Sequence, residues 1–544
     1  MSRKIQFSKQ IPFRNGHWLA FGLVVILHFV VQRPQEPVFN GDSNRHVMTS
    51  VFFRDFLVDQ PSSAPRQYAE DYNEQYPALG LLVWPPMFHA TSGLAMVVFG
   101  TSVAVPRVLV LLSCVLATWC LMRLCRRRMP IEQASFVAAL FGLMPLVFEF
   151  SRYVMLEMPT LALCLLCLDQ FDQWLAKERK RSLYLAAIAA AIAALTRFDA
   201  VVLVPMLIFQ VAFQGQYKRL ASRHILVAAC LAIAIVAPTY ILIWSELGEL
   251  HMRQAAESVS GRESPQTLLG RILFYPSCVL SQVGWVSTFL VTVGIFACLR
   301  CQNRSALPVF ASILLATFLT FTPLAELTSR HTIYWLPALA WLAAIGAEEF
   351  GHQLSKFASF FSRKGSVFVV KFCLLLATAI TSFLQPVYRV TGYADAAQVA
   401  ITHTEPNDRI LIEGWWDGNI TYHLRHLDPN RQRNVLRADK ELYSFTNVPN
   451  VDFEQFVSTD HEILREINRL DARCIIFEDP QPYGEIRISE QMRRLIRSMP
   501  DTFPVIKTVQ VQSTVPHSRK VQLFVFKVKQ DFLKSDLTSG SLVK

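Results

Sequence analysis

The stretch IEQASFVAALFGLMPLVFEFSRYVMLEMPTLALCLLCLDQFDQWL, residues 131–175, decides the fold class of this chain. It contains two apolar runs, 131–148 and 154–175, around a short polar tip. Each run is about as long as a helix that crosses a bilayer. The basic clusters RLCRRR (123–128) and KERKR (177–181) flank the pair, as is typical of loops on the cytoplasmic side of a membrane. The stretch therefore predicts a helical hairpin whose tip lies on the opposite side.

The same pattern continues along most of the chain. The 544 residues are 52% hydrophobic and 17% charged, below the roughly 25% charged residues of an average soluble protein. Apolar runs recur from residue 17 to residue 385, whereas residues 386–544 have an ordinary soluble composition. The first run, 17–31, lacks a small-x-small cleavage site, so we expect a retained helix. The sequence therefore predicts a multi-pass helical membrane domain over 1–385 and a soluble domain over 386–544.

The net charge of +11 comes largely from Lys and Arg between apolar runs. Further basic clusters lie at 217–224, 299–304 and 356–364. A nucleic-acid-binding protein would gather such charge on one folded surface beside stacking aromatics, so we expect no nucleic-acid partner. Ten of the 11 cysteines lie in or beside the apolar part, and we expect no disulfide framework there. A bound divalent metal remains an alternative, but the spacing of the His and Cys residues gives it no strong support. The sequence indicates no other cofactor.

The basic clusters also predict a topology. If all of them are cytoplasmic, an even number of passes separates each neighbouring pair. Residues 183–213 then form a hairpin of two short passes with TRFD (196–199) at the outer tip, and 277–299 forms one pass. Residues 79–99, with their Trp-Pro-Pro triplet, must lie along the outer surface as a juxtamembrane helix. The count is eleven passes, with residues 34–104 as one large outer loop.

This topology places the conspicuous polar residues on one side of the membrane. They are Asp42, Arg45, His46, Glu149, Arg152, Glu157, Arg197, Asp199, His251, Glu326, Arg330 and His331. Ionisable groups at helix ends often only reach toward the interface, so each residue alone has a structural explanation. Asp42, considered from its local sequence, is more readily explained as a helix N-cap than as a general base. Together the residues predict a polar cleft at the outer surface.

The other candidates have similar alternatives. Glu157 begins LEMPTLALCLL with a Pro in the first turn, so favourable capping of the helix and a catalytic role are equally compatible. Arg152 either lies at the interface or binds an anionic headgroup, because guanidinium pairs well with phosphate. Arg330 and His331 precede an apolar run and allow both interpretations. We expect His251 to be an ordinary surface residue rather than a metal ligand.

Four short motifs carry a resemblance to a known family. DSNRH (42–46) is similar to a family motif Asp-Glu-x-Arg-Tyr, with Asp42 and Arg45 matching, Ser43 in place of Glu and His46 in place of the aromatic residue. WPPM is similar to Lys-Pro-Pro-Leu, with Trp84 in place of Lys. SRYVMLEMP and SRHTIYWLPAL are similar to the second acidic tip and to a late Arg-Tyr-x-x-x-x-x-Pro region.

Over residues 15–385, the order and sidedness of these motifs resemble the GT-C membrane glycosyltransferases of the glycosyltransferase family 39 type. These are the dolichyl-phosphate-mannose protein mannosyltransferases and the bacterial relative that adds aminoarabinose to lipid A. The resemblance implies a polytopic α-helical membrane protein of GT-C fold with about 11 transmembrane helices plus juxtamembrane helices. We expect it in a bacterial plasma membrane rather than the endoplasmic reticulum.

The resemblance also implies an activity. A polyprenyl-phosphate-linked sugar, a hexose or pentose as in the mannosyltransferases, would be transferred with inversion to a hydroxyl of a protein, lipid or glycan acceptor on the outer face. Asp42 and Glu157 would be the catalytic residues. The substrate-binding residues would be Arg45, His46, Trp84, Arg152, Arg330 and His331. Arg152 and Arg330 would stabilise the departing lipid phosphate.

The segment 386–544 predicts a soluble α/β domain. DRILIEG and ARCIIFED are typical of buried strands, DHEILREINRL and ISEQMRRLIRSM of amphipathic helices, and FPVIKTVQVQS and KVQLFVFKV of a closing antiparallel pair. The number of preceding passes places the domain outside the cytoplasm. EGWWDGN (413–419) follows a strand, where α/β domains often carry binding loops, but we favour packing for Trp415 and Trp416.

Two other classes of protein stay open. A secondary transporter would show internal repeats and charges near the middle of broken helices. No clear repeat is visible, and the charges fall at helix tips. A non-catalytic envelope protein of the same fold is the second alternative, because Ser43 stands where the family has a second acid.

Overall fold

The computed structural model describes residues 16–31, 41–61, 63–259, 265, 267–300, 306–324, 327–357, 362–414, 416–444, 453–480, 486–514 and 521–533. The expected site residue Glu326 and the residue Trp415 lie outside these ranges. The chain divides into two compact units. The first comprises Met1–Gln32, Val110–Arg152 and Leu156–Gln385, and the second comprises Arg33–Leu109, Tyr153–Met155 and Pro386–Lys544. The second unit therefore combines the loop segment 33–109 with the C-terminal segment.

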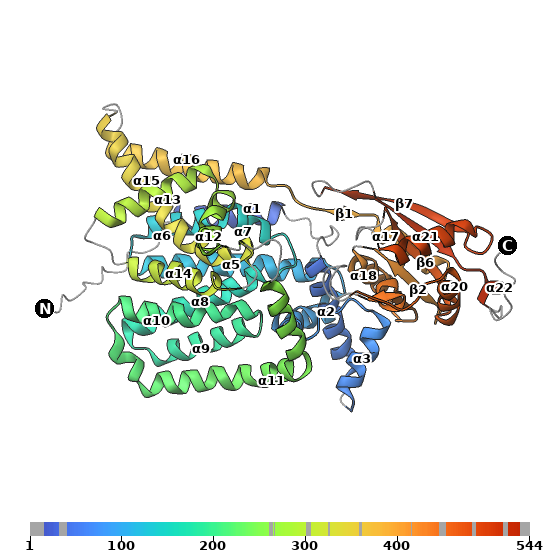
Figure 1. The fold of residues 1–544 in the computed structure, drawn as a ribbon. Coiled ribbons are helices and arrows are strands. Elements are labelled where there is room, and N and C mark those ends of the chain that lie inside the picture. The colour runs from blue at the N-terminus through green and yellow to red at the C-terminus, as the bar shows by residue number, and fades with distance from the viewer. Residues whose placement is uncertain are drawn as a thin grey trace. The chain divides into compact units, whose positions relative to one another are not determined.

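The first unit is a helical bundle (Figure 1). Its helices are α1 (Gly16–Val31), α5 (Ala104–Arg126, which begins in the second unit), α6 (Ile131–Leu143), α7 (Pro145–Phe150), α8 (Glu157–Lys177), α9 (Lys180–Ala194), α10 (Leu203–Phe213), α11 (Arg223–Val259), α12 (Leu268–Val283), α13 (Trp285–Arg300), α14 (Leu307–Phe321), α15 (Leu336–Phe357) and α16 (Arg363–Leu384), with the 3-10 helices η1 (Phe198–Val202), η2 (Tyr217–Ala221) and η3 (Ser329–Trp335). α9 packs between α8 and α11. α13 and α15 approach so closely at Gly294 and Gly346 that a Cβ on either would overlap the other's backbone.

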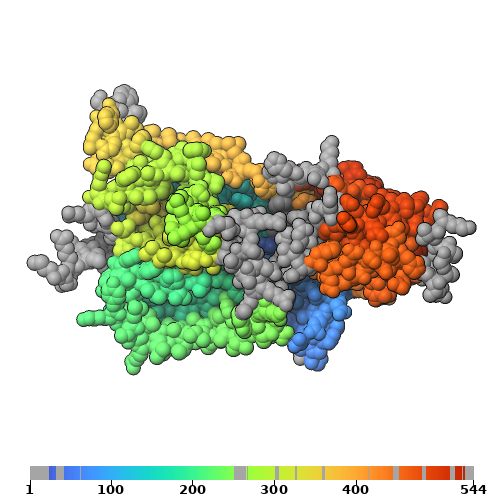
Figure 2. All heavy atoms as spheres, viewed as in Figure 1, coloured from blue at the N-terminus to red at the C-terminus, as the bar shows by residue number. Residues whose placement is uncertain are grey.

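The apolar helices support a membrane location for this unit. Three described helices are long and apolar enough to cross a bilayer: Ala104–Arg126, Arg223–Glu249 and Arg363–Leu384. Six shorter helices are also apolar. α11 lies on the surface of the unit (Figure 2), and it exposes large apolar side chains such as Ile233 and Ile241. Such a surface is expected where lipid chains replace water.

Helix breaks divide several of the expected passes. The hairpin expected over 183–213 is present, because α9 ends at Ala194 and α10 begins at Leu203 after η1. The run 277–299, expected as one pass, is divided between two helices: Gly284, at φ +84°, separates α12 from α13. Glycine tolerates this left-handed conformation, which ends a helix. The run 131–148 is likewise divided at Met144 and Pro145.

The second unit begins with three helices of the loop segment. These are α2 (Gly41–Asp59), α3 (Pro65–Gln75) and α4 (Met87–Phe99). α4 has 13 residues and is about 20 Å long, which is shorter than the roughly 30 Å hydrocarbon core of a bilayer. This length fits a helix lying along the membrane surface, and Val98 and Phe99 expose most of their apolar surface.

The C-terminal part of the second unit is an α/β domain built on a six-stranded sheet of order β1-β7-β8-β6-β2-β3. Its strands are β1 (Val390–Thr391), β2 (Arg409–Glu413), β3 (Asn434–Arg437), β6 (Ala472–Asp479), β7 (Val505–Ser513) and β8 (Val521–Lys527), with a separate pair β4 (Tyr443–Ser444) and β5 (Glu454–Gln455). β2 pairs in parallel with β3 and β6, and β7 and β8 form the expected antiparallel pair.

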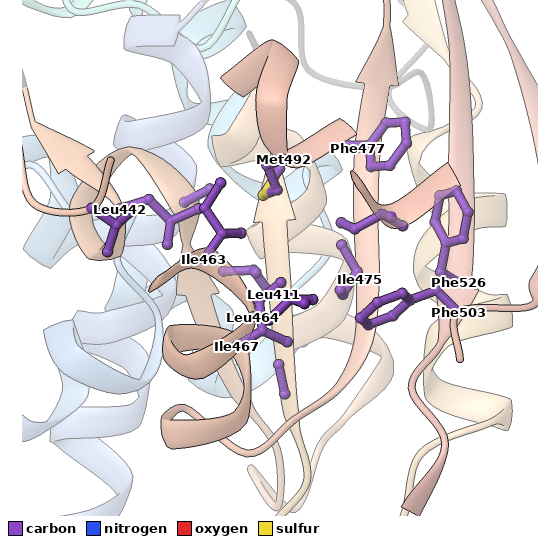
Figure 3. Packing of buried hydrophobic residues seen from close by; sticks show 14 of the residues in the cluster. Leu411, Leu442, Ile463, Leu464, Ile467, Ile475, Phe477, Met492, Phe503 and Phe526 are labelled. Atoms are coloured by element: carbon purple, nitrogen blue, oxygen red, sulfur yellow. The ribbon is translucent and has the colours of Figure 1, made fainter. Parts of the chain in front are cut away.

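Helices cover this sheet. They are α17 (Tyr393–Thr402), α18 (Asp417–Leu427), α19 (Ala438–Glu441), α20 (Asp460–Arg469), α21 (Arg487–Ser498) and α22 (Gln530–Leu533). The two expected amphipathic helices correspond to α20 and α21. Their buried residues Ile463, Ile467 and Met492 pack with the strand residues Leu411 and Ile475 in one core (Figure 3). This apolar burial provides the main free energy of folding for the domain.

The loop segment and the C-terminal domain pack directly against each other. Arg425 of α18 donates to Asp55 of α2 at 2.6 and 3.0 Å, and the Tyr72 hydroxyl of α3 donates to the same carboxylate at 2.7 Å. All three side chains are nearly inaccessible to solvent. Gly418 lies so close to Asn44 that a Cβ would come within 2.8 Å of the Asn44 Cβ. A buried ion pair of this kind fixes geometry, because removing one partner strands the other charge.

Candidate active site

The first unit gathers an ionic cluster at the start of α8. Glu157 is the first residue of α8 and is 2% exposed. The Arg197 guanidinium, just before η1, forms an ion pair with the Glu157 carboxylate and lies 2.6 Å from Asp199. Arg330 of η3 lies 3.7 Å from Glu157. We call Glu157, Arg197, Asp199 and Arg330 the Glu157 cluster; its formal charge is zero, from two arginines and two carboxylates.

The two arginines of this cluster differ in how they are held. The Arg197 side chain is 12% exposed and contacts both carboxylates. Burial opposes its charge, but Glu157 and Asp199 outweigh burial and raise the pKa of Arg197. The Arg330 side chain is 35% exposed and makes a longer ion pair. Arg197 therefore organises the cluster, whereas Arg330 is better placed to meet an anion from outside.

His331 lies beside the cluster among aromatic side chains. Its Nδ1 is 3.1 Å from the Tyr275 hydroxyl, and its Nε2 is 3.6 Å from an Asp199 carboxylate oxygen. The Phe321 ring stacks on the imidazole at a centroid distance of 4.4 Å. Burial lowers the pKa of His331 to about 4, although Asp199 opposes this shift. His331 is therefore neutral near pH 7 in this arrangement.

Arg152 has a separate setting at the end of α7. Its Nε donates to the Phe148 carbonyl at 3.0 Å, and its guanidinium lies 4.3 Å from the centre of the Phe148 ring. The neighbouring Ser151 hydroxyl lies 3.0 Å from Nδ1 of the buried His28, whose other ring nitrogen donates to the Gly142 carbonyl at 2.7 Å. His28 thus ties α1 to the turn that carries Arg152.

The second unit contains the other expected site residues, in the first turns of α2. Asp42 and Arg45 are partly exposed, whereas His46 is 2% exposed. His46 Nδ1 lies 3.0 Å from Nε2 of the buried His89, and the Trp84 ring meets the His46 ring edge-on at 4.5 Å. His46 and Trp84 therefore have packing roles in joining α2 to α4.

Arg45 also faces charged groups of the C-terminal domain. Electrostatic coupling links Arg45 to Asp417 and Lys440. Asp417 is paired with Arg437 at 2.5 Å, and its pKa is raised by burial against the effect of Arg437. The stretch EGWWDGN therefore brings an acidic side chain to the helix that carries Asp42 and Arg45, which its sequence position did not reveal.

The structure thus brings some of the expected site residues together within each unit. Glu157, Arg330 and His331 form one cluster, and Asp42, Arg45, His46 and Trp84 share one corner of the second unit. Arg197 and Asp199 were expected among the residues of the polar cleft, but without a catalytic or substrate-binding role. Their interruption of an apolar run was the only sequence signal for them. No group of three or more His, Cys, Asp or Glu side chains is arranged to hold a metal within the described ranges.

One family model matches part of the chain. The model for dolichyl-phosphate-mannose-protein mannosyltransferases matches residues 83–244. This match includes Trp84, Arg152 and Glu157. No curated protein matches the chain. The family match covers less than half of the chain, and the fold is of the GT-C type.

Solved structures show the same fold. Apo ArnT from Cupriavidus metallidurans has a TM-score of 0.61 at 14% identity, over 95% of this chain and 99% of that chain. ArnT bound to undecaprenyl phosphate has a TM-score of 0.59 at 13% identity, over 96% and 99%. The mycobacterial arabinofuranosyltransferase AftD has a TM-score of 0.54 at 12% identity, over 96% of this chain and 42% of its own. At these identities the likeness defines the fold.

Proposed function

We propose that the chain transfers a sugar, with inversion, from a polyprenyl-phosphate donor to an acceptor hydroxyl on the extracytoplasmic face of a membrane. The observation that carries the proposal is the Glu157 cluster, where a partly exposed Arg330 is held beside a buried acid in a GT-C fold. ArnT, of the same fold, is described with bound undecaprenyl phosphate. An apolar bundle accommodates the isoprenoid tail of such a donor, and arginine pairs with its phosphate.

The reaction needs one proton acceptor and one anion-stabilising group. Asp42 accepts the proton of the acceptor hydroxyl while that oxygen bonds to the anomeric carbon. The bond between the anomeric carbon and the phosphate oxygen breaks, and its electron pair leaves with the lipid phosphate. Arg330 stabilises the negative charge that grows on this phosphate. Attack opposite the departing phosphate inverts the anomeric centre.

Glu157 then acts through the arginines. It is buried, and its carboxylate is engaged by Arg197 with Arg330 further away. A buried carboxylate that is ion-paired with arginine holds those side chains in place. We therefore assign Glu157 a positioning role, and Asp42 the role of base. The acceptor hydroxyl can belong to a protein, a lipid or a glycan. The donor sugar can be a hexose or a pentose.

Replacing Asp42 tests the proposed base. We expect Asp42→Asn to lower turnover by about 10²- to 10⁴-fold, the usual contribution of general base catalysis, while binding of undecaprenyl phosphate persists. Purified protein in nanodiscs would be assayed with radiolabelled polyprenyl-phosphate mannose and polyprenyl-phosphate aminoarabinose. Acceptors would be identified beforehand by mass spectrometry of glycans and lipids from a deletion strain.

The matched control is Asp71→Asn, an exposed acid on the neighbouring α3. It removes the same charge from the same segment and should retain full turnover. Wild-type turnover by the Asp42 variant would rule out the assigned base. Failure of the wild type to turn over any polyprenyl-phosphate sugar would instead favour the non-catalytic alternative. The transporter alternative receives no support from the family match or from the structures above.

A further inference from the structure

The hydroxyl of Tyr275 lies between two acceptors. It is 3.1 Å from His331 Nδ1 and 3.4 Å from the Phe321 carbonyl oxygen. A phenol has one proton, so it donates to only one of the two at a time. The choice between them is a rotation of the hydroxyl hydrogen alone. This geometry makes Tyr275 compatible with two states of the imidazole.

In the first state His331 is neutral. Tyr275 donates to Nδ1, and the proton on Nε2 faces Asp199 at 3.6 Å. In the second state His331 is an imidazolium. Nδ1 then donates to the Tyr275 oxygen, Tyr275 donates to the Phe321 carbonyl, and the Nε2 proton still faces Asp199. In both states the imidazole and the Tyr275 hydroxyl remain hydrogen-bonded, and only the Phe321 carbonyl gains or loses a donor, so the site can gain a proton without moving a heavy atom.

The charged groups around His331 decide which state prevails. Asp199 faces the ring, with Arg197 behind it, and the adjacent Arg330 connects to Glu157 on α8. These four charges sum to zero. From α12, Arg271 donates to the carbonyls of Thr322 and Leu324. From α14, the uncharged Phe321 packs against the His331 ring. With no ligand, burial therefore keeps the imidazole neutral.

A lipid phosphate changes this balance. It brings one negative charge as a sugar phosphodiester and nearly two as the free phosphomonoester. One negative charge at about 4 Å in a medium of effective dielectric about 20 favours a proton by about three pKa units. The pKa of His331 would then rise from about 4 into the neutral range, and more so for the leaving group than for the donor.

We propose that His331 takes up a proton from solvent when a lipid phosphate binds, and returns it when the phosphate leaves. His331 thereby provides a second positive charge, beside Arg330, that is present only when the anion is. The proton of the acceptor hydroxyl stays on Asp42, so the transfer itself remains balanced. This inference rests on the proposed function, because it names the ligand of the same site.

Proton uptake on binding is directly measurable. Full-length protein in nanodiscs would be titrated calorimetrically with undecaprenyl phosphate at pH 7, in buffers of different ionisation enthalpy. The wild type should take up at least about 0.3 proton more per bound lipid than His331→Gln, because a bound-state pKa near 7 leaves the site about half protonated. By linkage, the Kd of the wild type should rise more steeply with pH between 6.5 and 7.5 than that of the variant.

The matched control is His403→Gln, an exposed histidine of the second unit whose ring lies 2.9 Å from the Val399 carbonyl. It should take up protons like the wild type. Ring-¹⁵N histidine spectra of the wild type give a test that needs no variant to fold: an imidazolium signal should appear when undecaprenyl phosphate is added and be absent before. Equal uptake in wild type and His331→Gln, or no new imidazolium signal, would overturn the inference and leave the proposed transfer intact. If undecaprenyl phosphate did not bind the wild type, the proposed donor class itself would fail.

Discussion

The two ends of α8 carry two ionic clusters built from the same residue types. At the far end from Glu157, Asp172 accepts from Arg127 and Arg128 at 2.7 Å each and from Gln210 at 3.0 Å. Asp169 pairs with Arg127 at 2.7 Å and with Arg123 at 3.3 Å. We call these residues the Asp172 cluster; three arginines there surround two carboxylates that are at most 1% exposed.

The Glu157 cluster is arranged differently. Its two arginines meet two carboxylates, one ion pair is long, and one arginine is about one-third exposed. The His331 imidazole lies 3.6 Å from Asp199, and the Tyr275 phenol contacts that imidazole, whereas the Asp172 cluster is completed by the Gln210 amide. Buried ion pairs therefore occur both in the Asp172 cluster, which is structural, and in the Glu157 cluster, which we propose is functional. A long ion pair, a partly exposed arginine and a neighbouring imidazole are what mark the Glu157 end as a site.

The largest expected effect is on stability at the Asp172 end. Asp172→Asn removes the carboxylate that neutralises Arg127 and Arg128, and breaking such a buried pair costs about 3–5 kcal/mol. We expect reduced yield and a lower unfolding temperature in detergent, with turnover per folded molecule unchanged. Unfolding would be followed by circular dichroism. A stable Asp172→Asn protein that had lost turnover would contradict the assignment of the Asp172 cluster to stability and of the Glu157 cluster to catalysis.

A matched pair of arginines sharpens the comparison. Arg330 and Arg123 are 35% and 33% exposed, and each is the more distant arginine of a buried acid that another arginine already holds. Arg330→Gln should lower turnover by about 10²- to 10³-fold, the usual loss when one donor to a developing charge is removed. Arg123→Gln should retain turnover. The measurement is the initial rate at saturating lipid donor.

Stability provides the internal check on this pair. Each substitution should cost less than about 1 kcal/mol, because each arginine is partly exposed and leaves the buried acid paired. If both variants lost turnover equally, the proposed catalytic role of the partly exposed Arg330 would be contradicted. If Arg330→Gln unfolded the protein while Arg123→Gln did not, Arg330 would be structural.

The clusters also show what could be predicted from the sequence. The strands β2 and β6 and the helices α20 and α21 were predictable, because local periodicity reports which face of an element is buried. The hairpin around Arg197 and Asp199 was predictable from the basic clusters on either side of it, which call for an even number of passes between them. The break at Gly284 was missed, because one glycine hardly changes the mean hydropathy of a long apolar run.

Contacts between distant residues could not be predicted in this way. Arg197 and Arg330 are far from Glu157 in sequence, and no spacing brings them together until the helices pack. The pairing of Asp55 with Arg425, 370 residues apart, likewise joins the loop segment to the C-terminal domain. The order and sidedness of the polar tips predict which residues share a surface, but only packing decides which of them touch.

The smallest expected change in the free energy of unfolding is at an exposed ion pair on α3. Arg66 and Glu70 form an i,i+4 pair at 2.9 Å on α3, with side chains 74% and 52% exposed. Solvent screens such a pair, so Arg66→Ala should change the free energy of unfolding by about 0.5 kcal/mol or less and leave turnover unchanged. Denaturant titration beside Asp172→Asn measures both on one scale. Comparable losses in the two variants would mean that burial does not separate the clusters as argued, since the same charge pairing would then count equally in water and inside the helix bundle.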